Sequence, residues 1–180
     1  AELYPDDYTI NVEALEKVLP KDLSASEISV RLGATWIPPE IIKQFMFELF
    51  NTPHYYRWKI PVHYSPATAQ WFIENKSTDR SNFLAHSTYG TARISGYKIL
   101  EETLNLREVR IFDTVDDGNG GKVSVLNKKE TAIAQGKQEL IRQKFGEWIW
   151  ADPVRREKLV RMYNDRFNST RPREYDGSHL

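Results

Sequence analysis

The chain has 180 residues, with 25 basic and 25 acidic side chains, four histidines and no cysteine. A 40% share of apolar residues, with five Trp, nine Tyr and eight Phe, is enough for a packed core and argues against general disorder. The lack of cysteine excludes a disulfide framework, a thiol nucleophile and a cysteine-ligated metal, and it is typical of a reducing compartment. No apolar run approaches the roughly 20 residues that cross a bilayer, and no secretory signal pattern opens the sequence, so we expect no membrane partner.

Charge is unevenly distributed along this neutral chain. Residues 1–60 carry 6 Lys and Arg against 9 Asp and Glu, and residues 61–120 carry 6 against 8. Residues 121–180 carry 13 against 8, which is a net charge of +5. A basic C-terminal third is a mild indication of a phosphate-bearing partner, although an ordinary solvated helix surface also explains it.

The N-terminal part predicts an irregular lead-in over 1–10 and then a helical lobe over 11–52. A short helix follows the capping residue Asn11, and a capping-box pattern at Ser24 predicts a second helix over 24–33. A third helix begins at a Pro-Pro pair, where a missing N–H costs little. Its wide apolar face predicts a core helix, formed by Ile41, Ile42, Phe45, Met46, Leu49 and Phe50.

The middle of the chain, residues 53–127, predicts two hairpins separated by a helix. Alternating apolar runs and turn residues indicate the strands, and the run from Asp116 to Gly121 is a strong hairpin-turn signal. In chain order we expect strands 56–64 and 70–74, a loop over 75–88, a helix over 91–106, and strands 109–113 and 122–126.

The C-terminal part, residues 128–168, predicts two helices with a break at Asp152-Pro153. The first covers 128–150, and the second carries an inner stripe of Leu159, Met162, Tyr163 and Phe167. The tail over 169–180 has no hydrophobic period and is interpreted as a linker.

Together these elements predict the α+β class: a small antiparallel sheet of two hairpins with helices packed on one face and a helical N-terminal lobe. We expect a single domain over 11–168, and the pattern leaves the strand order open.

Known catalytic motifs are missing from the sequence. There is no phosphate-binding GxxxxGK[ST] loop, no GxGxxG after a strand, no GxSxG and no HExxH. The spacing of His54, His63, His86 and His179 matches no metal site on a predicted helix, so we expect neither a metal nor a cofactor in this segment. Two adjacent carboxylate pairs, Glu101-Glu102 and Asp116-Asp117, are interpreted as a solvated helix face and a turn.

The predicted C-terminal helix carries the one basic cluster with a functional interpretation. Arg155, Lys158 and Arg161 fall on one stripe that we expect to face outward, where it could follow a phosphate backbone. The alternative is a solvated face with i, i+4 pairing between Arg161 and Asp165. The candidate DNA-binding set is Arg155, Arg156, Lys158, Arg161, Arg171, Arg173, Lys128 and Lys129. The aromatic residues that could stack on bases, or else belong to the core, are Trp58, Trp71, Tyr89 and Tyr97.

Four stretches carry a resemblance to a known setting. They are Asp22-Leu-Ser-Ala-Ser-Glu-Ile-Ser-Val-Arg-Leu-Gly-Ala-Thr-Trp-Ile-Pro, Tyr89-Gly-Thr-Ala-Arg-Ile-Ser-Gly-Tyr-Lys-Ile-Leu-Glu-Glu-Thr-Leu-Asn-Leu-Arg, Leu126-Asn-Lys-Lys-Glu-Thr-Ala and Arg171-Pro-Arg-Glu-Tyr-Asp-Gly-Ser-His-Leu. They resemble the region between the N-6 adenine DNA methylase domain and the Swi/Snf-type (DEAD/DEAH-like) helicase domain of large bacterial plasmid and phage methylase–helicase fusion proteins. The similarity extends over most of residues 20–180.

The resemblance implies an enzymatic parent protein of the bacterial cytoplasm whose methyltransferase and ATPase activities, with S-adenosylmethionine and ATP/Mg, belong to other domains. The methylase Asn-Pro-Pro-Tyr-type motif and the helicase ATP motifs are absent from the sequence, so no catalytic residue is carried over. The expected partners are DNA and the flanking methylase and helicase domains.

Three hypotheses follow. The first is a non-catalytic accessory domain that contacts or positions DNA through the basic C-terminal helix. The second is a structural spacer or docking platform with an exposed apolar patch, for which Trp148, Trp150 and the Tyr89-Gly90 segment are candidates. The third is an independent enzyme that uses His63 or His86 with a carboxylate, which no spacing in the sequence supports.

Overall fold

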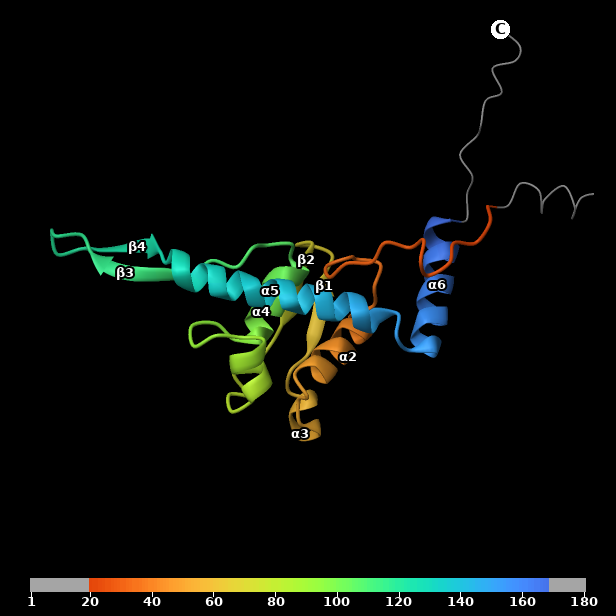
Figure 1. Cartoon of the computed structure of the whole chain (residues 1–180), viewed down its shortest axis with the longest axis horizontal. Coiled ribbons are helices and arrows are strands. Elements are labelled where there is room, and N and C mark those ends of the chain that lie inside the picture. The colour runs from red at the N-terminus through yellow and green to blue at the C-terminus, as the bar shows by residue number, and fades with distance from the viewer. Residues whose placement is uncertain (1–19, 169–180) are drawn as a thin grey trace, which may run out of the picture. The chain divides into compact units, whose positions relative to one another are not determined.

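In the computed structural model the described residues are 20–168, and their contacts belong to two compact units (Figure 1). The larger unit, Val30–Asp152, contains all the described strands and every described helix but one. The smaller unit combines the two ends of the chain, of which residues 20–29 and 153–168 are described. The boundaries between the two units fall at Val30 and at Pro153, where α6 begins, and the single domain over 11–168 stays a prediction.

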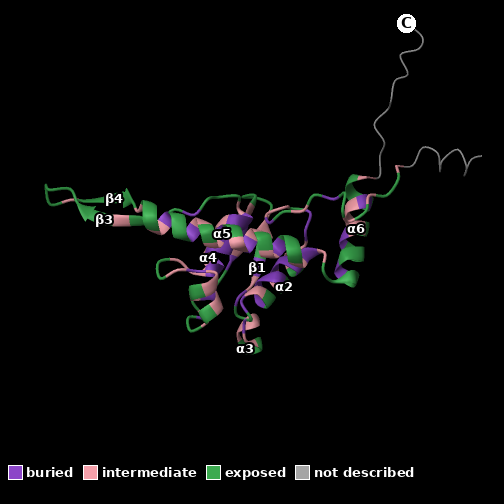
Figure 2. Cartoon of the chain, in the orientation of Figure 1, coloured by how far each residue is buried: buried purple, intermediate pink, exposed green. Residues whose placement is uncertain are grey.

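The core of the larger unit is built around three helices and one hairpin. Helix α2 (Pro39–Leu49) packs on β1 (Val62–Ser65), and α4 (Gly96–Leu104) packs on β2 (Gln70–Ile73) and on α5 (Lys128–Ile149). Figure 2 shows buried residues along these elements. The side chains with under 2% of their surface exposed include Phe45, Phe50, Tyr97 and Phe145.

Helix α2 begins where the two prolines predict it, with Pro38 in an extended conformation before the first turn. Of its expected apolar face, Ile41, Ile42, Phe45 and Met46 are buried, as is Phe50 directly after the helix. The Phe45 ring meets the edge of Phe145 with 5.1 Å between centroids, which joins α2 to α5.

The second hairpin stands apart from the first. Among residues 20–168, strands β3 (Phe112–Asp116) and β4 (Lys122–Leu126) pair only with each other, as do β1 and β2, so this part of the chain forms two separate two-stranded antiparallel sheets. Nearly every residue of β3 and β4 is exposed (Figure 2). The α+β class is confirmed, and helices α2 and α4 pack on the first hairpin.

The prediction of a strand over 56–64 was wrong in its first half. Residues His54–Arg57 form the short helix α3, and the strand begins only at Val62. Local hydrogen bonds explain the difference: the Tyr56 N–H donates to the Pro53 carbonyl at 2.9 Å, and the Arg57 side chain donates to the Thr52 carbonyl at 2.9 Å. These hydrogen bonds form a helical turn, although the aromatic side chains of this segment favour a strand.

The helix predicted over 24–33 was also wrong. The capping contact forms, because the Glu27 carboxylate accepts from the Ser24 N–H at 2.8 Å, but only a single turn follows it. The Leu23 backbone is instead bonded to Asn164, which donates to its carbonyl and accepts from its N–H. This tertiary contact offsets the weak local preference for a helix. The lead-in expected over 1–10, the short helix expected after Asn11 and the linker expected over 169–180 lie outside the described residues.

Three further elements differ from expectation in the stretch before the long helix. The loop predicted over 75–88 contains a π-helical turn, η1 (Leu84–Thr88). Helix α4 starts at Gly96 rather than near Thr91, because the Ser95 side chain caps it by accepting from the Lys98 N–H. Residues 109–111 precede β3 rather than belonging to it.

Candidate nucleic-acid interface

Helix α6 (Pro153–Phe167) carries four of the cations predicted to contact DNA, and the structure separates one of them from the others. Arg155 is buried, with 8% of its surface exposed, so its placement on the outer face was wrong. The reason is the helical repeat: Arg155 lies one turn before Leu159, which is fully buried, and residues four apart share a face.

The other three predicted cations of α6 are exposed: Arg156, Lys158 and Arg161. Arg161 lies 3.4 Å from Asp165, which is the pair that the sequence offered as the alternative interpretation. Both side chains are more than 60% exposed, so the pair contributes little to stability and can exchange for another anion.

A groove of about 580 Å³ lies between α6 and the segment around Asp22 and Ala25, and Arg156 and Arg161 are among its lining residues. Asn164 holds the segment in place, since its side-chain amide donates to the Leu23 carbonyl at 2.9 Å. The cations therefore border a formed surface.

The remaining candidates are not part of this surface as the structure describes it. Lys128 and Lys129 are exposed in the first turn of α5, which belongs to the larger unit. Arg171 and Arg173 lie outside the described residues. The structure thus groups three of the eight predicted cations on one exposed helix.

The larger unit carries a second surface that the sequence did not predict as a site. We define the α3 surface by five residues: Lys43 on α2, and Tyr55, Arg57, Trp58 and Lys59 on or next to α3. Trp58 and Tyr55 are 73% and 64% exposed. The sequence signal was the run Tyr55-Tyr56-Arg57-Trp58-Lys59, which alternates aromatic and basic side chains but was interpreted as a strand.

Cations lie close to the aromatic rings of this surface. The Lys59 Nζ is 5.1 Å from the Trp58 ring centroid, and the Arg57 guanidinium is 5.5 Å from that of Phe47. Lys43 approaches the same Phe47 ring at 5.9 Å. A groove of about 350 Å³ runs beside them, lined by Glu40, Lys43, Gln44, Phe47, Glu48 and Arg57.

Of the four aromatics proposed to stack on bases, only Trp58 is exposed enough to do so. Trp71 and Tyr97 are buried in the core, at 2% and 0% exposure, and Tyr89 is half-buried. The Tyr97 hydroxyl lies 2.6 Å from that of Thr52 and donates to the buried Asp79 at 3.0 Å. Burial, with Asp79 beside it, raises the pKa of Tyr97 well above its ordinary value.

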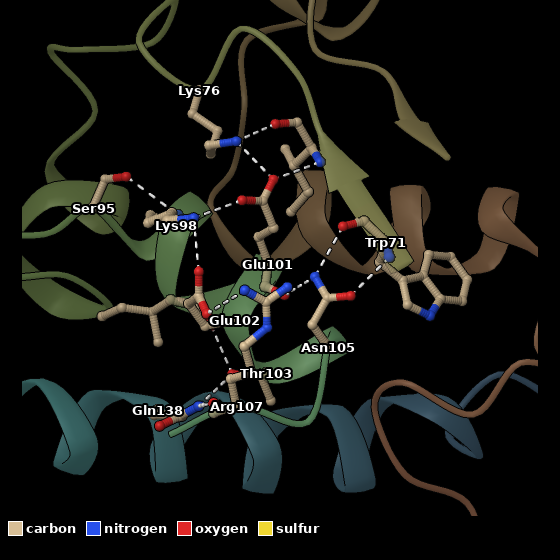
Figure 3. A network of polar contacts seen from close by, with 12 residues as sticks. Trp71, Lys76, Ser95, Lys98, Glu101, Glu102, Thr103, Asn105, Arg107 and Gln138 are labelled. Carbon is tan, nitrogen blue, oxygen red and sulfur yellow. Dashed lines mark hydrogen bonds and ion pairs between the residues drawn. The ribbon is translucent and has the colours of Figure 1, made fainter. Parts of the chain in front are cut away.

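The interpretation of Glu101-Glu102 as a solvated helix face was wrong for Glu101, because this side chain is buried. Figure 3 shows its carboxylate facing Lys76 and Lys98 beside β2. It accepts from Lys76 Nζ at 2.6 Å, from Lys98 Nζ at 2.9 Å and from the Ile73 N–H at 2.9 Å. Because its oxygens are occupied in this way, the arrangement fastens α4 to β2 and leaves the carboxylate little capacity to act on a substrate.

The two histidines named as possible bases lie in different surroundings: His63 is on an exposed face, whereas the His86 Nε2 is buried and has no hydrogen-bond partner among the described residues. His63 Nδ1 is 3.6 Å from Glu74 on the exposed face of the first hairpin, and its ring stacks on Phe72. His86 is half-buried in η1. Within residues 20–168, no three His, Asp or Glu side chains converge as metal ligands would.

A family model described as a domain of unknown function, DUF8437, matches residues 31–169. The chain belongs to the DUF8437 family. No curated protein and no solved structure matches it significantly. The match extends over every described element, so the α3 surface, the second hairpin and α6 are all parts of the DUF8437 domain.

Across the described part of the chain, no helix has both the length and the apolar character that crossing a membrane requires.

Proposed function

We propose that this DUF8437 domain is a non-catalytic accessory domain that contacts DNA through α6. The observation that carries the proposal is the exposure of Arg156, Lys158 and Arg161 within two helical turns, beside a groove that two of them line. Exposed cations on one helix neutralise phosphates and release counterions, which gives affinity without sequence selectivity.

The resemblance to methylase–helicase fusion proteins supplies the context of the proposal. In that setting the domain lies in the bacterial cytoplasm between a methylase and a helicase, both of which act on DNA. S-adenosylmethionine and ATP with magnesium are bound by those neighbours. The domain then holds or orients DNA while the neighbours act.

The test is fluorescence anisotropy of a labelled duplex, titrated with the whole chain at two salt concentrations. We expect affinity to fall steeply with salt, and substitution of Arg156, Lys158 and Arg161 by Ala to reduce the slope of log K against log salt by up to about 3. A matched variant replaces Arg110, Lys122 and Lys137, which removes the same charge from the larger unit. Equal losses in both variants, or salt-independent titrations, would contradict a contact through α6.

A second candidate function, a docking platform, is favoured by the exposed β3–β4 hairpin. Its register places Val115, Val123 and Val125 on one face, and each is 43–48% exposed. An isolated two-stranded hairpin is marginally stable in water, so a covering partner would stabilise it. The acidic turn at Asp116-Asp117 disfavours a phosphate backbone as that partner. The apolar patch predicted from the sequence, at Trp148, Trp150 and Tyr89-Gly90, is less exposed to a docking partner. Trp148 and Trp150 are half-buried and Gly90 is buried.

This alternative predicts that a separate methylase or helicase domain binds the chain through the valine face. Val115→Thr with Val123→Thr keeps β propensity and should weaken that binding by about tenfold in calorimetry. Thr114→Ala with Ser124→Ala, on the opposite face of the hairpin, is the control. Unchanged affinity in the valine variant would exclude this face as the docking site.

A further inference from the structure

The α3 surface exposes more aromatic area than a stable fold requires. Trp58 and Tyr55 are 73% and 64% exposed, whereas the other described tryptophans are buried or half-buried. Large aromatic rings left in water at one place indicate a binding surface rather than part of the core.

The surface is also held in a fixed shape before any ligand binds. The Arg57 Nε donates to the Thr52 carbonyl at 2.9 Å, and Asn75 donates to the Lys59 carbonyl at 2.8 Å. The Tyr55 and Tyr56 rings meet edge to face with 4.5 Å between centroids. Both ends of α3 are therefore fastened to the body, so little conformational freedom is lost on binding.

The charge of the surface complements a phosphate chain. Lys43, Arg57 and Lys59 are cations, whereas the neighbouring groove is lined by two carboxylates, Glu40 and Glu48, as well as by Lys43 and Arg57. The Glu48 carboxylate accepts hydrogen bonds from Gln44 and from the Trp148 indole N–H, which draws it toward α5. The five residues that define the α3 surface include three cations and no carboxylate, so the surface itself is positively charged.

Exposed rings next to cations match the chemistry of unpaired nucleotides. Each base offers a π-face that stacks on Trp or Tyr, and the adjoining phosphate binds Lys or Arg. In a duplex the base faces are already stacked on one another, so Trp58 cannot reach them without unstacking. We infer that the α3 surface binds single-stranded nucleic acid, with a base stacked on Trp58 and its phosphates beside Lys59, Arg57 and Lys43.

This inference goes beyond the proposed contact through α6, because the surface lies in the other unit and uses different residues. Its test is anisotropy of labelled oligothymidylate, oligouridylate and duplex, titrated with the whole chain. We expect Trp58→Ala to weaken binding of the single strands by about five- to hundredfold and to leave duplex affinity unchanged. Trp58→Phe, which keeps a ring, should retain most of the affinity.

Phe83→Ala is the matched control, because Phe83 is an aromatic residue with 72% exposure elsewhere in the same unit. An abasic oligonucleotide of equal charge should bind as weakly as Trp58→Ala binds oligothymidylate. Comparing the affinities for oligouridylate and oligothymidylate shows whether the natural ligand is RNA or DNA.

Equal single-strand affinity for Trp58→Ala and the wild type would overturn the inference, and would leave the surface as a protein-binding one. The α6 variant tests the duplex contact separately, so either result stands without the other.

Discussion

Glu101 illustrates how a single residue connects a helix to a strand. Burial by itself raises the pKa of its carboxyl, but the hydrogen bonds from Lys76, Lys98 and the Ile73 N–H outweigh burial and lower the pKa below its ordinary value. A lowered folded-state pKa means that the charged form stabilises the fold above the ordinary value near 4.3, and that this stability is lost as the pH falls through the folded value.

We therefore expect Glu101→Gln to lower the free energy of unfolding by about 1.5–3 kcal/mol at neutral pH. The gap from the wild type should shrink on acidification below the ordinary glutamate pKa, since the wild type then loses the same charge. Urea unfolding at neutral and acidic pH measures both. Glu139→Gln, whose side chain is 72% exposed, should change stability by less than about 0.5 kcal/mol. An undiminished gap in acid would contradict the role of the charge.

Gly90 is required by the close approach of three backbone segments. A Cβ at this position would lie 2.3 Å from the Ala85 carbonyl oxygen and 2.8 Å from the Gly96 nitrogen. We expect Gly90→Ala to cost about 1–3 kcal/mol in thermal or urea unfolding. Gly136→Ala, in an open position on α5, should instead stabilise the chain by roughly 0.5–1 kcal/mol. The same sign for both substitutions would refute this explanation.

At the scale of elements, Asn127 joins the exposed hairpin to α5. Its side-chain oxygen caps the helix by accepting from the Glu130 N–H at 2.9 Å, and its amide donates to Asp113 at 2.7 Å. Arg93 and then Asn127, by hydrogen bonding, lower the pKa of Asp113. The cap and the hairpin base therefore depend on one side chain.

Asn127→Ala should cost about 1–2 kcal/mol, because both bonds are lost. Hydrogen exchange should accelerate in β3, in β4 and in the first turn of α5, and remain unchanged in α4. Asn127→Ser keeps the cap acceptor and should retain protection at the helix start while β3 exchanges faster. If exchange in the hairpin is the same in all three proteins, the hairpin is held by other contacts.

Elements with long periodic patterns were predicted well, and short ones were not. Helices α2 and α5 and both hairpin turns are near their predicted positions, because a wide apolar face or a Gly-rich turn leaves few alternatives. Helix α3 was missed because side-chain bonds to the Thr52 and Lys59 carbonyls, from residues five and sixteen positions away, decide its shape. The same error hid the α3 surface, since a strand would have alternated Trp58 with its neighbours across two faces.

The predicted cations of α6 show the limit of charge patterns. Charge spacing identified a basic helix, but it left out that Arg155 lies one turn before Leu159, which the apolar stripe had already placed on the inner face. Glu101 differed from its prediction for another reason: its partner Lys76 is 25 positions away in the sequence.

At the scale of the whole molecule, nearly all of the deep core belongs to one unit. The largest fully buried side chains all lie between Ile37 and Phe145, inside Val30–Asp152. Within the described part of the smaller unit, the buried apolar side chains are Ile28 and Leu159. The larger unit therefore contains the apolar burial that drives folding.

A fragment spanning 30–152 should accordingly unfold in one cooperative transition, with near-ultraviolet dichroism that shows fixed aromatic packing. Because it keeps α3 and lacks α6, we expect its affinity for oligothymidylate to lie within about threefold of that of the whole chain. The difference in binding free energy is then smaller than the roughly 1.4 kcal/mol that corresponds to a tenfold change. Its affinity for duplex DNA should fall to that of the α6 variant. A broad, non-cooperative transition would mean that the smaller unit completes the core, because a chain without fixed packing loses apolar surface gradually.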